Sequence, residues 1–221
     1  MKKIEVYKIT LTLVMIFSAF ETRGQFNFGI KGSYSLPFNT KQEIKYDDSQ
    51  DFLIYRVNFL ELDVSPTIAL VGYYRNDLVY FQLELAYKRV RSRFLADNYV
   101  DLENITQTEN VKQTHSLDFP LMAGIRIDHF KLGVGPTFSF IISENPIFQD
   151  VDLFEERRSS TEIGFGFTAG IVLYRLHVEM SYQYKFNGVG DYLYWRQDYR
   201  GFSQPVQFIE LSMGIFLYQF S

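Results

Sequence analysis

Three histidines, His115, His129 and His177, are the side chains of this sequence best suited to acid–base chemistry near neutral pH. Ser116 and Asp118 follow His115 closely, and serine, histidine and aspartate are the residue types of nucleophilic catalysis. The surrounding segment has the alternation of a strand, however, and adjacent strand residues point to opposite faces. His115 and Ser116 therefore cannot pair, and a serine from another strand would be needed. We expect no catalytic residue here, and we place all three histidines in structural or solvated positions.

Two other stretches have the composition of ligand sites. The glycines of "GFGFTAG", Gly164 to Gly170, resemble a phosphate loop, but the stretch reads as a strand with no helix after it, so the match fails. Asp47, Asp48 and Asp51 could hold a divalent cation or simply lie in a solvated loop. The chain contains no cysteine, which excludes thiolate metal sites and disulfides. We expect no cofactor and no metal.

The first 24 residues have the composition of a cleavable signal peptide. "MKKIEVYK" supplies three lysines, an apolar run follows from Ile9 to Phe20, and Gly24 precedes the expected cleavage site at Gln25. The alternative is a membrane anchor, but the apolar run is well short of the roughly 20 residues that a spanning helix needs. We therefore expect an exported protein with one domain over residues 25–221.

The composition limits the possible partners. The formal net charge of −4 argues against nucleic acid, and the aromatic fraction of 18%, with 22 Phe and 16 Tyr, is high. Beyond the signal peptide no apolar run is long enough for a membrane helix, so any insertion into a membrane must use strands.

Strict alternation of residue types predicts strands along the whole chain. In "VYFQLELAYK", Val79 to Lys88, every odd position is apolar or aromatic, and most of the even positions are polar or charged. Eight such segments are expected: Gln25–Pro37, Phe59–Tyr73, Leu78–Arg91, Lys112–Ile127, Phe130–Ile142, Ser160–Leu173, Leu176–Lys185 and Val206–Phe220.

The connections between these segments alternate in length. Tyr74–Asp77, Asp128–His129 and Tyr174–Arg175 are short. The others are long and polar, and we expect them to be loops: Phe38–Asn58, Ser92–Val111, Ser143–Ser159 and Phe186–Pro205. This pattern predicts an eight-stranded, antiparallel, up-and-down transmembrane β-barrel with tight turns at one end and extended loops at the other.

The composition of the two faces of the expected strands indicates that the apolar face contacts lipid and not a protein core. The charged face combines both signs with Gly, Ala and Ser, as the narrow interior of an eight-stranded barrel requires. A lipocalin-like soluble barrel is the alternative. We expect an ion-pair network in the lumen, formed by Lys31, Glu61, Asp63, Glu84, Lys88, Asp118, Arg126, Lys131, Glu162, Glu179 and Lys185. Tyrosines near the strand ends suit an aromatic girdle: Tyr73, Tyr74, Tyr87, Tyr174, Tyr184 and Tyr218.

In the last expected strand, Val206–Phe220, the apolar residues do not stay on one face. Ile209 to Leu217 places apolar residues at odd positions, whereas Phe216, Tyr218 and Phe220 occupy even ones, and a bulge near Ile215 would reconcile the two.

The last long connection, "DYLYWRQDYRGF", is rich in residue types found in binding hot spots. Either these side chains form a recognition surface, or they are interfacial aromatics with arginines that contact headgroup phosphates. The candidates are Tyr192, Tyr194, Trp195, Arg196, Tyr199, Arg200 and Phe202.

The chain resembles the small outer membrane β-barrel proteins of Bacteroidota, the porin-family or outer-membrane-protein β-barrel domain. The resemblance rests on "FNFGIKGSYS", "LDFPLMAGIRID", "KLGVGPTFSF" and the terminal "IELSMGIFLYQFS", and it covers residues 25–221. Members of that family usually end on Phe, whereas Ser221 follows Phe220 here. The resemblance implies an outer membrane location and a barrel fold.

We therefore expect a non-enzymatic structural or surface-binding protein that contacts outer membrane lipids and lipopolysaccharide, with a possible envelope protein partner and no nucleic acid. The packed lumen makes bulk diffusion of solutes improbable. An accessory component of a secretion or assembly machine is the alternative, and a lipid-modifying membrane enzyme is less favoured.

Overall fold

The computed structural model describes residues 24–38, 42–47, 53–99, 106–145, 154–157, 160–186, 192–195, 198–200 and 206–220. The expected signal peptide lies outside the described residues except for Gly24. Within the described ranges, no helix is long and apolar enough to cross a membrane.

The described chain consists of β-strands joined by antiparallel ladders. The strands are β1 (Gln25–Phe38), β2 (Gln42–Asp47), β3 (Leu53–Val64), β4 (Thr67–Asn76), β5 (Val79–Asn98), β6 (Thr106–Ile127), β7 (Phe130–Glu144), β8 (Phe154–Arg157), β9 (Thr161–Leu173), β10 (Leu176–Lys185), β11 (Tyr192–Trp195), β12 (Asp198–Arg200) and β13 (Val206–Phe220).

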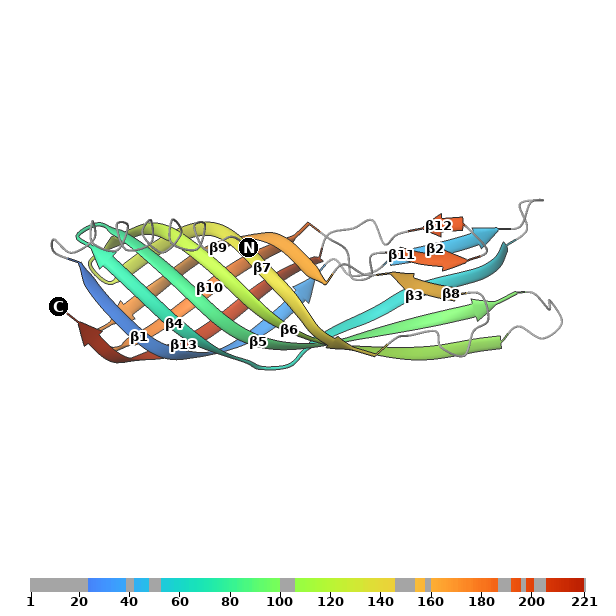
Figure 1. The fold of residues 1–221 in the computed structure, drawn as a ribbon, viewed down its shortest axis with the longest axis horizontal. Coiled ribbons are helices and arrows are strands. Elements are labelled where there is room, and N and C mark those ends of the chain that lie inside the picture. Colours follow the sequence, from blue (N-terminus) through green and yellow to red (C-terminus); the bar gives the residue numbers. More distant parts are fainter. Residues whose placement is uncertain are drawn as a thin grey trace, which may run out of the picture.

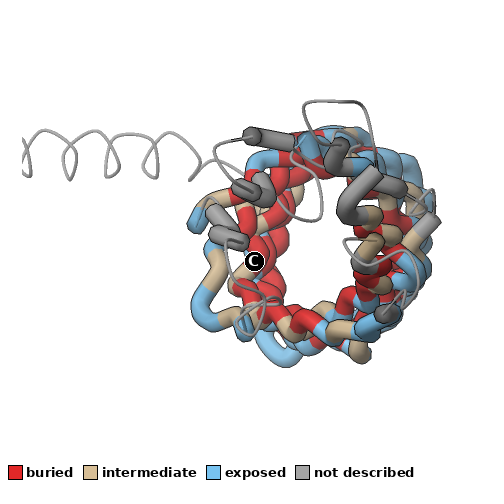
Figure 2. Tube along the Cα trace, turned by 90° about the vertical axis from the view of Figure 1, so that its right-hand side faces the viewer, coloured by how far each residue is buried: buried red, intermediate tan, exposed pale blue. Residues whose placement is uncertain are grey.

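The main sheet closes on itself. Pairing runs from β5 through β4, β1, β13, β10, β9 and β7 to β6, and β6 pairs again with β5 (Figures 1 and 2). Ring neighbours follow one another along the chain, so the topology is up-and-down. The all-β fold and its closed antiparallel ring confirm these parts of the prediction.

Three tight turns close the end of the ring where β1 begins and β13 ends (Figure 1). They fall between β4 and β5, between β6 and β7, and between β9 and β10, as expected. Asp77, Asp128 and Tyr174 take φ angles of 46°, 52° and 56° in these turns. A left-handed residue in a two-residue hairpin loop matches the right-handed twist of the strands that it joins.

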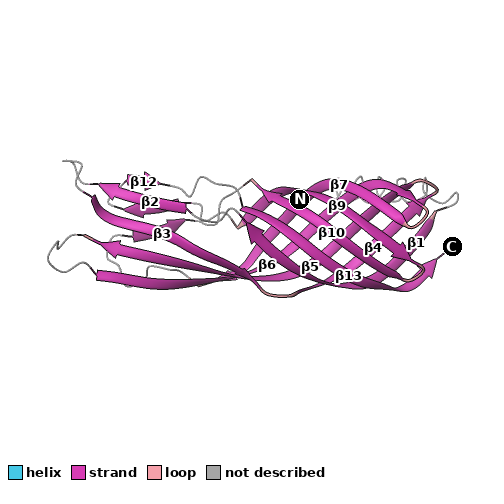
Figure 3. Ribbon diagram, turned by 180° about the vertical axis from the view of Figure 1, so that it is seen from behind, coloured by secondary structure: helices cyan, strands magenta, loops and turns pink. Residues whose placement is uncertain are grey.

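The opposite end carries strands where long loops were expected, so that expectation is wrong. The ladder between β5 and β6 keeps one register from Val79 and Ile125 to Asn98 and Thr106. β3 pairs with residues Val90–Asn98 of β5, and β2 pairs with β3. A separate three-stranded sheet of β12, β11 and β8 lies at the same end (Figures 1 and 3). We call β2, β3, Val90–Asn98 of β5 and Thr106–Gln113 of β6 the extension.

Within the ring, apolar side chains point outward and polar ones inward. On β7, Phe130, Leu132 and Val134 are exposed, whereas Lys131 between them is 1% exposed. Figure 2 shows the buried residues on the inner side of the tube around the ring. This arrangement reverses that of a water-soluble protein, whose apolar side chains lie inside. The outward apolar side chains of the ring strands form what we call the apolar belt.

The outward face of β5 changes from apolar to charged along the strand, and apolar residues appear on its inward face. In the ring, the outward residues run from Val79 to Tyr87 and are apolar, and the inward ones include Gln82 and Glu84. In the extension, the outward residues include Arg91 and Arg93, and the buried inward ones are the polar Ser92 and the apolar Phe94 and Ala96. β5 therefore has the outer surface of a membrane strand from Val79 to Tyr87 and that of a water-exposed strand from Arg91 onward.

Breaks in alternation between β3 and β4 overturn part of the expected lumen network. The register with β5 shifts between Phe59 and Glu61, and Ser65 and Pro66 interrupt the strand. Each irregularity changes which face the next residues occupy. Glu61 and Asp63 are consequently exposed, not inside the lumen, and Leu62 and Val64 are buried in their place.

The expected bulge in the last strand is present. Phe28 faces Tyr218 while Gly29 faces Phe216, so Leu217 is the extra residue, two positions beyond the expected site. Phe216 therefore points inward and is buried, while Tyr218 points outward. Phe216 packs with Val71, Tyr73, Tyr80 and Val172 in an apolar cluster near the turns. Tyr73 thus belongs to the interior and not to an aromatic girdle.

Close approach of neighbouring strands explains the inward glycines and gives a first prediction. A Cβ atom on Gly135 would clash with the main-chain oxygen of Leu121 on β6, whereas a Cβ atom on the outward Gly32 would meet nothing. We expect Gly135→Ala to lower the free energy of unfolding by about 1–3 kcal/mol through overpacking. Gly32→Ala is the matched control and should change it by less than about 0.5 kcal/mol. Urea unfolding of both variants measures the difference. Equal free energies of unfolding for the two variants would contradict the close packing of Gly135 against β6.

Candidate functional site

The ring interior holds charged side chains in direct contact. Lys131 Nζ on β7 lies 2.5 Å from Glu179 Oε1 on β10, and it also donates to Gln82 Oε1 on β5 at 2.5 Å. β9 separates β7 from β10, and β6 separates β7 from β5. These side chains therefore meet across the lumen and not along one sheet face.

Lys31 on β1 is surrounded by three carboxylates. Its Nζ lies 2.5 Å from Glu84 Oε2, 3.8 Å from Glu179 Oε2 and 4.0 Å from Glu210 Oε1. Lys31 is 4% exposed, so its charge has been removed almost wholly from water. A lysine in such a position is tolerated only because opposite charges replace its hydration.

The contacts continue toward the extension with alternating sign. Glu210 lies 3.4 Å from Lys88, and Lys88 lies 3.8 Å from Asp118. Asp118 lies 4.0 Å from Lys185, and Lys185 lies 2.8 Å from Glu162. Together with the preceding pairs they form what we call the interior charge chain: Lys131, Glu179, Lys31, Glu210, Lys88, Asp118, Lys185 and Glu162, with Glu84 as a branch on Lys31.

Serine and glutamine side chains complete the hydrogen bonding around this chain. Ser35 Oγ donates to Glu210 Oε2 at 3.0 Å, and Gln82 Nε2 donates to Glu84 Oε1 at 2.5 Å. Ser116 Oγ donates to Asp118 Oδ1 at 2.9 Å. Carboxylates have up to four acceptor positions, so such donors satisfy oxygens that the lysines do not reach. The result is a connected polar network that fills the middle of the ring.

The structure brings together eight of the eleven expected network residues: Lys31, Glu84, Lys88, Asp118, Lys131, Glu162, Glu179 and Lys185. Glu61 and Asp63 lie outside the ring, as described above. Arg126 is half-buried beside a turn, where its Nε donates to the carbonyl oxygen of Asp128 at 2.9 Å.

Sequence reasoning missed Glu210, which is 5% exposed and contacts both Lys31 and Lys88. The odd apolar positions of the last strand could have placed Glu210 inward, but the ambiguous phase near Phe216 obscured that signal. Lys112 was also missed; it is 1% exposed on the inner side of the extension, and its Nζ lies 3.3 Å from Glu144 Oε2.

His177 lies at the other end of the interior charge chain. It is fully buried, its ring stacks on Phe216 at 4.7 Å, and its Nε2 lies 3.7 Å from Glu179 Oε1. Neither ring nitrogen has a hydrogen-bond partner among the described residues. His177 therefore points into the lumen beside Glu179 and packs against the cluster around Phe216.

His115 lies on the outer face and belongs to a different hydrogen-bonded group. Its Nδ1 is 2.5 Å from the Tyr87 hydroxyl, and its Nε2 is 2.7 Å from Gln113 Nε2. Gln113 Oε1 in turn accepts from Arg89 Nη2 at 2.9 Å. Because an amide nitrogen only donates, His115 Nε2 is the acceptor and Nδ1 carries the proton. Ser116 faces the lumen, so this serine and histidine do not form a pair.

The residues of the expected recognition surface cannot be placed. Arg196 and Phe202 lie outside the described residues, and so do the side chains of Tyr192, Tyr194, Trp195, Tyr199 and Arg200. Asp48 and Asp51 also lie outside them, as does the side chain of Asp47. Across the part of the chain that is described, no group of three or more His, Asp or Glu side chains could hold a metal ion.

No protein-family model matches the chain, and no curated protein matches it. Among solved structures, the chain is similar to the translocator domain of the autotransporter NalP from Neisseria meningitidis. The two share 9% sequence identity with a TM-score of 0.33, over 96% of this chain and 95% of that one.

Proposed function

We propose that this protein crosses an outer membrane with eight strands, keeps a packed lumen, and acts without catalysis through its extension as a structural or surface-binding protein. The membrane-crossing strands are β1, β4, β5, β6, β7, β9, β10 and β13. Their partners in this proposal are outer membrane lipids and lipopolysaccharide, with an envelope protein as a further partner. The resemblance to small barrel proteins of Bacteroidota, and export through a cleaved signal, remain predictions.

The change of the outward face of β5 from apolar to charged carries the proposal. A strand that stayed in water would keep its apolar face inside throughout, because burial of apolar surface stabilises the fold. β5 instead presents apolar residues outward from Val79 to Tyr87 and arginines outward from Arg91. A strand that leaves hydrocarbon and enters water has to change in this way, since lipid faces must be apolar and water faces polar.

Strand lengths support the same placement. A tilted strand crosses a bilayer with about 9–11 residues. β4 and β10 each have 10 residues, and both stay within the ring. β5 and β6 have 20 and 22 residues, about twice the crossing length, so their upper halves would project outside the membrane.

The interior charge chain supports a closed lumen. An eight-stranded barrel is just wide enough for side chains to fill its interior. Here Lys131, Lys31, Lys88 and Lys185 each contact a carboxylate on a strand that is not their ladder neighbour, and for Lys185 this is Asp118 on β6. Solute passage would require these contacts to separate in a site with little water, which is costly. The proposal therefore contains no channel activity.

In this proposal the extension provides the surface that binds a partner. Its outward face mixes both signs of charge, with Arg93 3.7 Å from Glu61 and 4.0 Å from Glu109. These exposed pairs are weak and can exchange for pairs with a partner. A role as accessory component of a secretion or assembly machine uses the same surface and remains the alternative. A lipid-modifying enzyme is less favoured, because His115 and Ser116 lie on opposite faces.

Fractionation of the cells that make this protein tests the proposal. We expect the chain in the outer membrane fraction, resistant to extraction by alkaline carbonate. On gels it should migrate faster unheated than boiled, because a closed barrel stays folded in the detergent. Recovery of a compact monomer from the soluble fraction without detergent would contradict membrane insertion and favour a secreted carrier.

A further inference from the structure

A short row of arginines begins on the outer face of β5 where the apolar belt ends. Tyr87 is the last belt residue on this strand, and Arg89 and Arg91 occupy the next two outward positions. Tyr87 and Arg91 are exposed, and Arg89 is half-buried. The proposed function places the boundary between hydrocarbon and water at this level, so the two arginines stand where lipid headgroups would lie.

The charges of these two arginines are not neutralised by a neighbour. Asp63 on β3 is the ladder partner of Arg91, yet no carboxylate lies within ion-pair distance of Arg89 or Arg91 in the described part of the chain. Arg93, the next outward arginine, differs from them because it contacts two carboxylates, at 3.7 and 4.0 Å. Only the first two positive charges of the row are therefore available to an anion.

Arg89 begins a chain of hydrogen bonds that ends at Tyr87. Its Nη2 donates to Gln113 Oε1 at 2.9 Å, and Gln113 Nε2 lies 2.7 Å from His115 Nε2. Because a guanidinium can only donate, Oε1 of Gln113 is fixed as the acceptor, and the amide nitrogen donates to the histidine. His115 Nδ1 therefore carries the proton and donates to the Tyr87 hydroxyl oxygen at 2.5 Å.

The resulting group presents mainly hydrogen-bond donors to a ligand. The Tyr87 oxygen accepts from His115, so the Tyr87 O–H is left to donate. Arg89 uses one N–H on Gln113, and its buried Nε has no hydrogen-bond partner among the described residues. Arg91 adds a second guanidinium at the next outward position. Such a set of donors favours an anion with several oxygens, as phosphate has.

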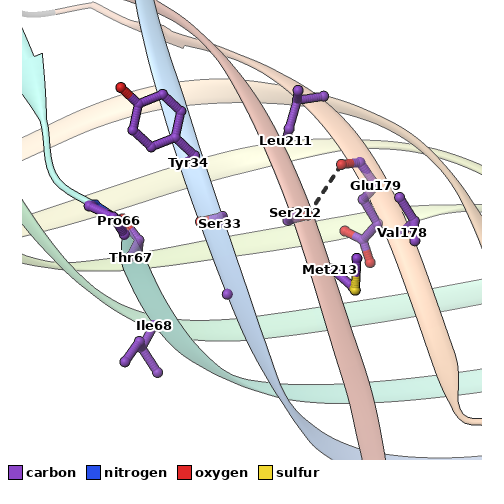
Figure 4. A pocket seen from close by; sticks show the side chains of 11 residues that line it. Ser33, Tyr34, Pro66, Thr67, Ile68, Val178, Glu179, Leu211, Ser212 and Met213 are labelled. Atoms are coloured by element: carbon purple, nitrogen blue, oxygen red, sulfur yellow. Dashed lines mark hydrogen bonds between the residues drawn. The ribbon is translucent and has the colours of Figure 1, made fainter.

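The outer wall around Gly32 shows the contrast. A hollow lies there over β4, β1, β13 and β10, and its exposed side chains are Tyr34, Ile68, Leu211 and Met213 (Figure 4). None of these four side chains carries a charge, so this part of the belt gives an anionic group no counter-charge. The arginines of β5 therefore mark a separate, polar level at the edge of the belt.

The end of the ring at which the arginines lie indicates which lipid they face. Up-and-down membrane barrels have their tight turns on the periplasmic side and their longer segments outside. The three tight turns lie at the end of the ring opposite the extension (Figure 1). The arginines would therefore face the outer leaflet, whose lipid is lipopolysaccharide and whose phosphates lie close to the acyl chains.

We propose that Arg89, Arg91 and Tyr87 bind a phosphate group on the lipid A part of lipopolysaccharide. The inference rests on the proposed function, which names lipopolysaccharide as a partner without assigning it a site. Each guanidinium donates to phosphate oxygens, and the Tyr87 hydroxyl donates to an oxygen on the side of the belt. The acyl chains of the same molecule lie along the exposed side chains that precede Tyr87 on this face, Leu85 and Leu83.

Native mass spectrometry of the full chain in detergent, with added lipid A, tests the proposal. We expect lipid A to be retained about tenfold more strongly than the same lipid without its phosphates, because the donors need an anion. Arg89→Gln and Arg91→Gln should each weaken retention about tenfold through loss of charge-assisted hydrogen bonds. Tyr87→Phe should weaken it about threefold through loss of one hydroxyl donor.

Arg93→Gln is the matched control, because it is the same substitution on the same face of β5. The charge of Arg93 already has two carboxylate partners, so this variant should retain lipid A within about twofold of the unmodified protein. Equal losses for Arg93→Gln and Arg89→Gln would mean that net charge alone holds the lipid, and would overturn the site. Equal retention of lipid A with and without phosphate would overturn it as well.

Two further arms separate lipopolysaccharide from other sources of phosphate. Displacement of lipid A by an equal concentration of inorganic phosphate would assign the arginines to a free anion. Retention of phosphatidylglycerol as strong as that of lipid A would assign them to phospholipid. Either result would overturn the lipopolysaccharide site and leave the barrel standing, whereas absence of the heat-dependent gel shift in the unmodified protein would overturn the proposed function.

Discussion

Replacement of Glu179 by leucine is expected to lower the free energy of unfolding by about 3–5 kcal/mol, the cost of leaving buried charges without their partner. Glu179 is 2% exposed and contacts Lys131 at 2.5 Å and Lys31 at 3.8 Å. Lys31 keeps Glu84 and Glu210 as partners, whereas no other carboxylate lies within ion-pair distance of Lys131 in the described part of the chain. Most of the destabilisation should therefore come from leaving the Lys131 charge without a carboxylate partner.

Urea unfolding in phospholipid vesicles, followed by the heat-dependent gel shift, measures this change. Glu61→Leu is the matched control, since its side chain is 61% exposed and its pair with Arg93 is weak, and it should cost less than about 1 kcal/mol. Adding Lys131→Met to Glu179→Leu should recover part of the loss, because no unpaired charge then remains there. A cost below about 1 kcal/mol for Glu179→Leu would mean that water fills the lumen.

Strand positions and faces could be predicted wherever alternation was strict. On β7 the apolar residues from Phe130 to Phe140 occupy every second position, with glycine, serine and lysine between them. A period of two sets both the strand and the side on which each residue lies. Lys131 could therefore be placed in the lumen without knowledge of its neighbours.

The extension could not be recognised in this way, although its alternation is present in the sequence. Residues such as Ser92 and Arg93 make the segment after Arg91 look like a polar loop. Phe94 and Ala96 nevertheless alternate with outward residues such as Arg93 and are buried. The pattern was obscured because apolar residues enter the inner face at the level where the outer face changes from apolar to charged.

The charge partners in the lumen depend on contacts between strands, which one sequence does not specify. The register shift after Phe59 moved Glu61 and Asp63 to the outside, and only the pairing with β5 reveals it.

Val134→Arg is expected to lower the free energy of unfolding by about 2–4 kcal/mol in lipid vesicles, because it places a charge near the middle of the apolar belt. Val134 is 40% exposed on β7, with Ala123 and Phe167 as its neighbours on β6 and β9. In a water-soluble barrel the same exposed position would tolerate arginine, and the change would stay within about 0.5 kcal/mol. The measurement therefore separates lipid from water as the medium around the belt.

Val111→Arg supplies the matched control, because it is the same substitution at an exposed outward position of β6 in the extension. We expect it to change the free energy of unfolding by less than about 0.5 kcal/mol, since this part of β6 would stand in water. Equal costs at Val134 and Val111 would place both positions in one medium and remove the membrane boundary. A large cost at Val134 alone locates that boundary between the two residues, where β5 changes its outward side chains from tyrosine to arginine.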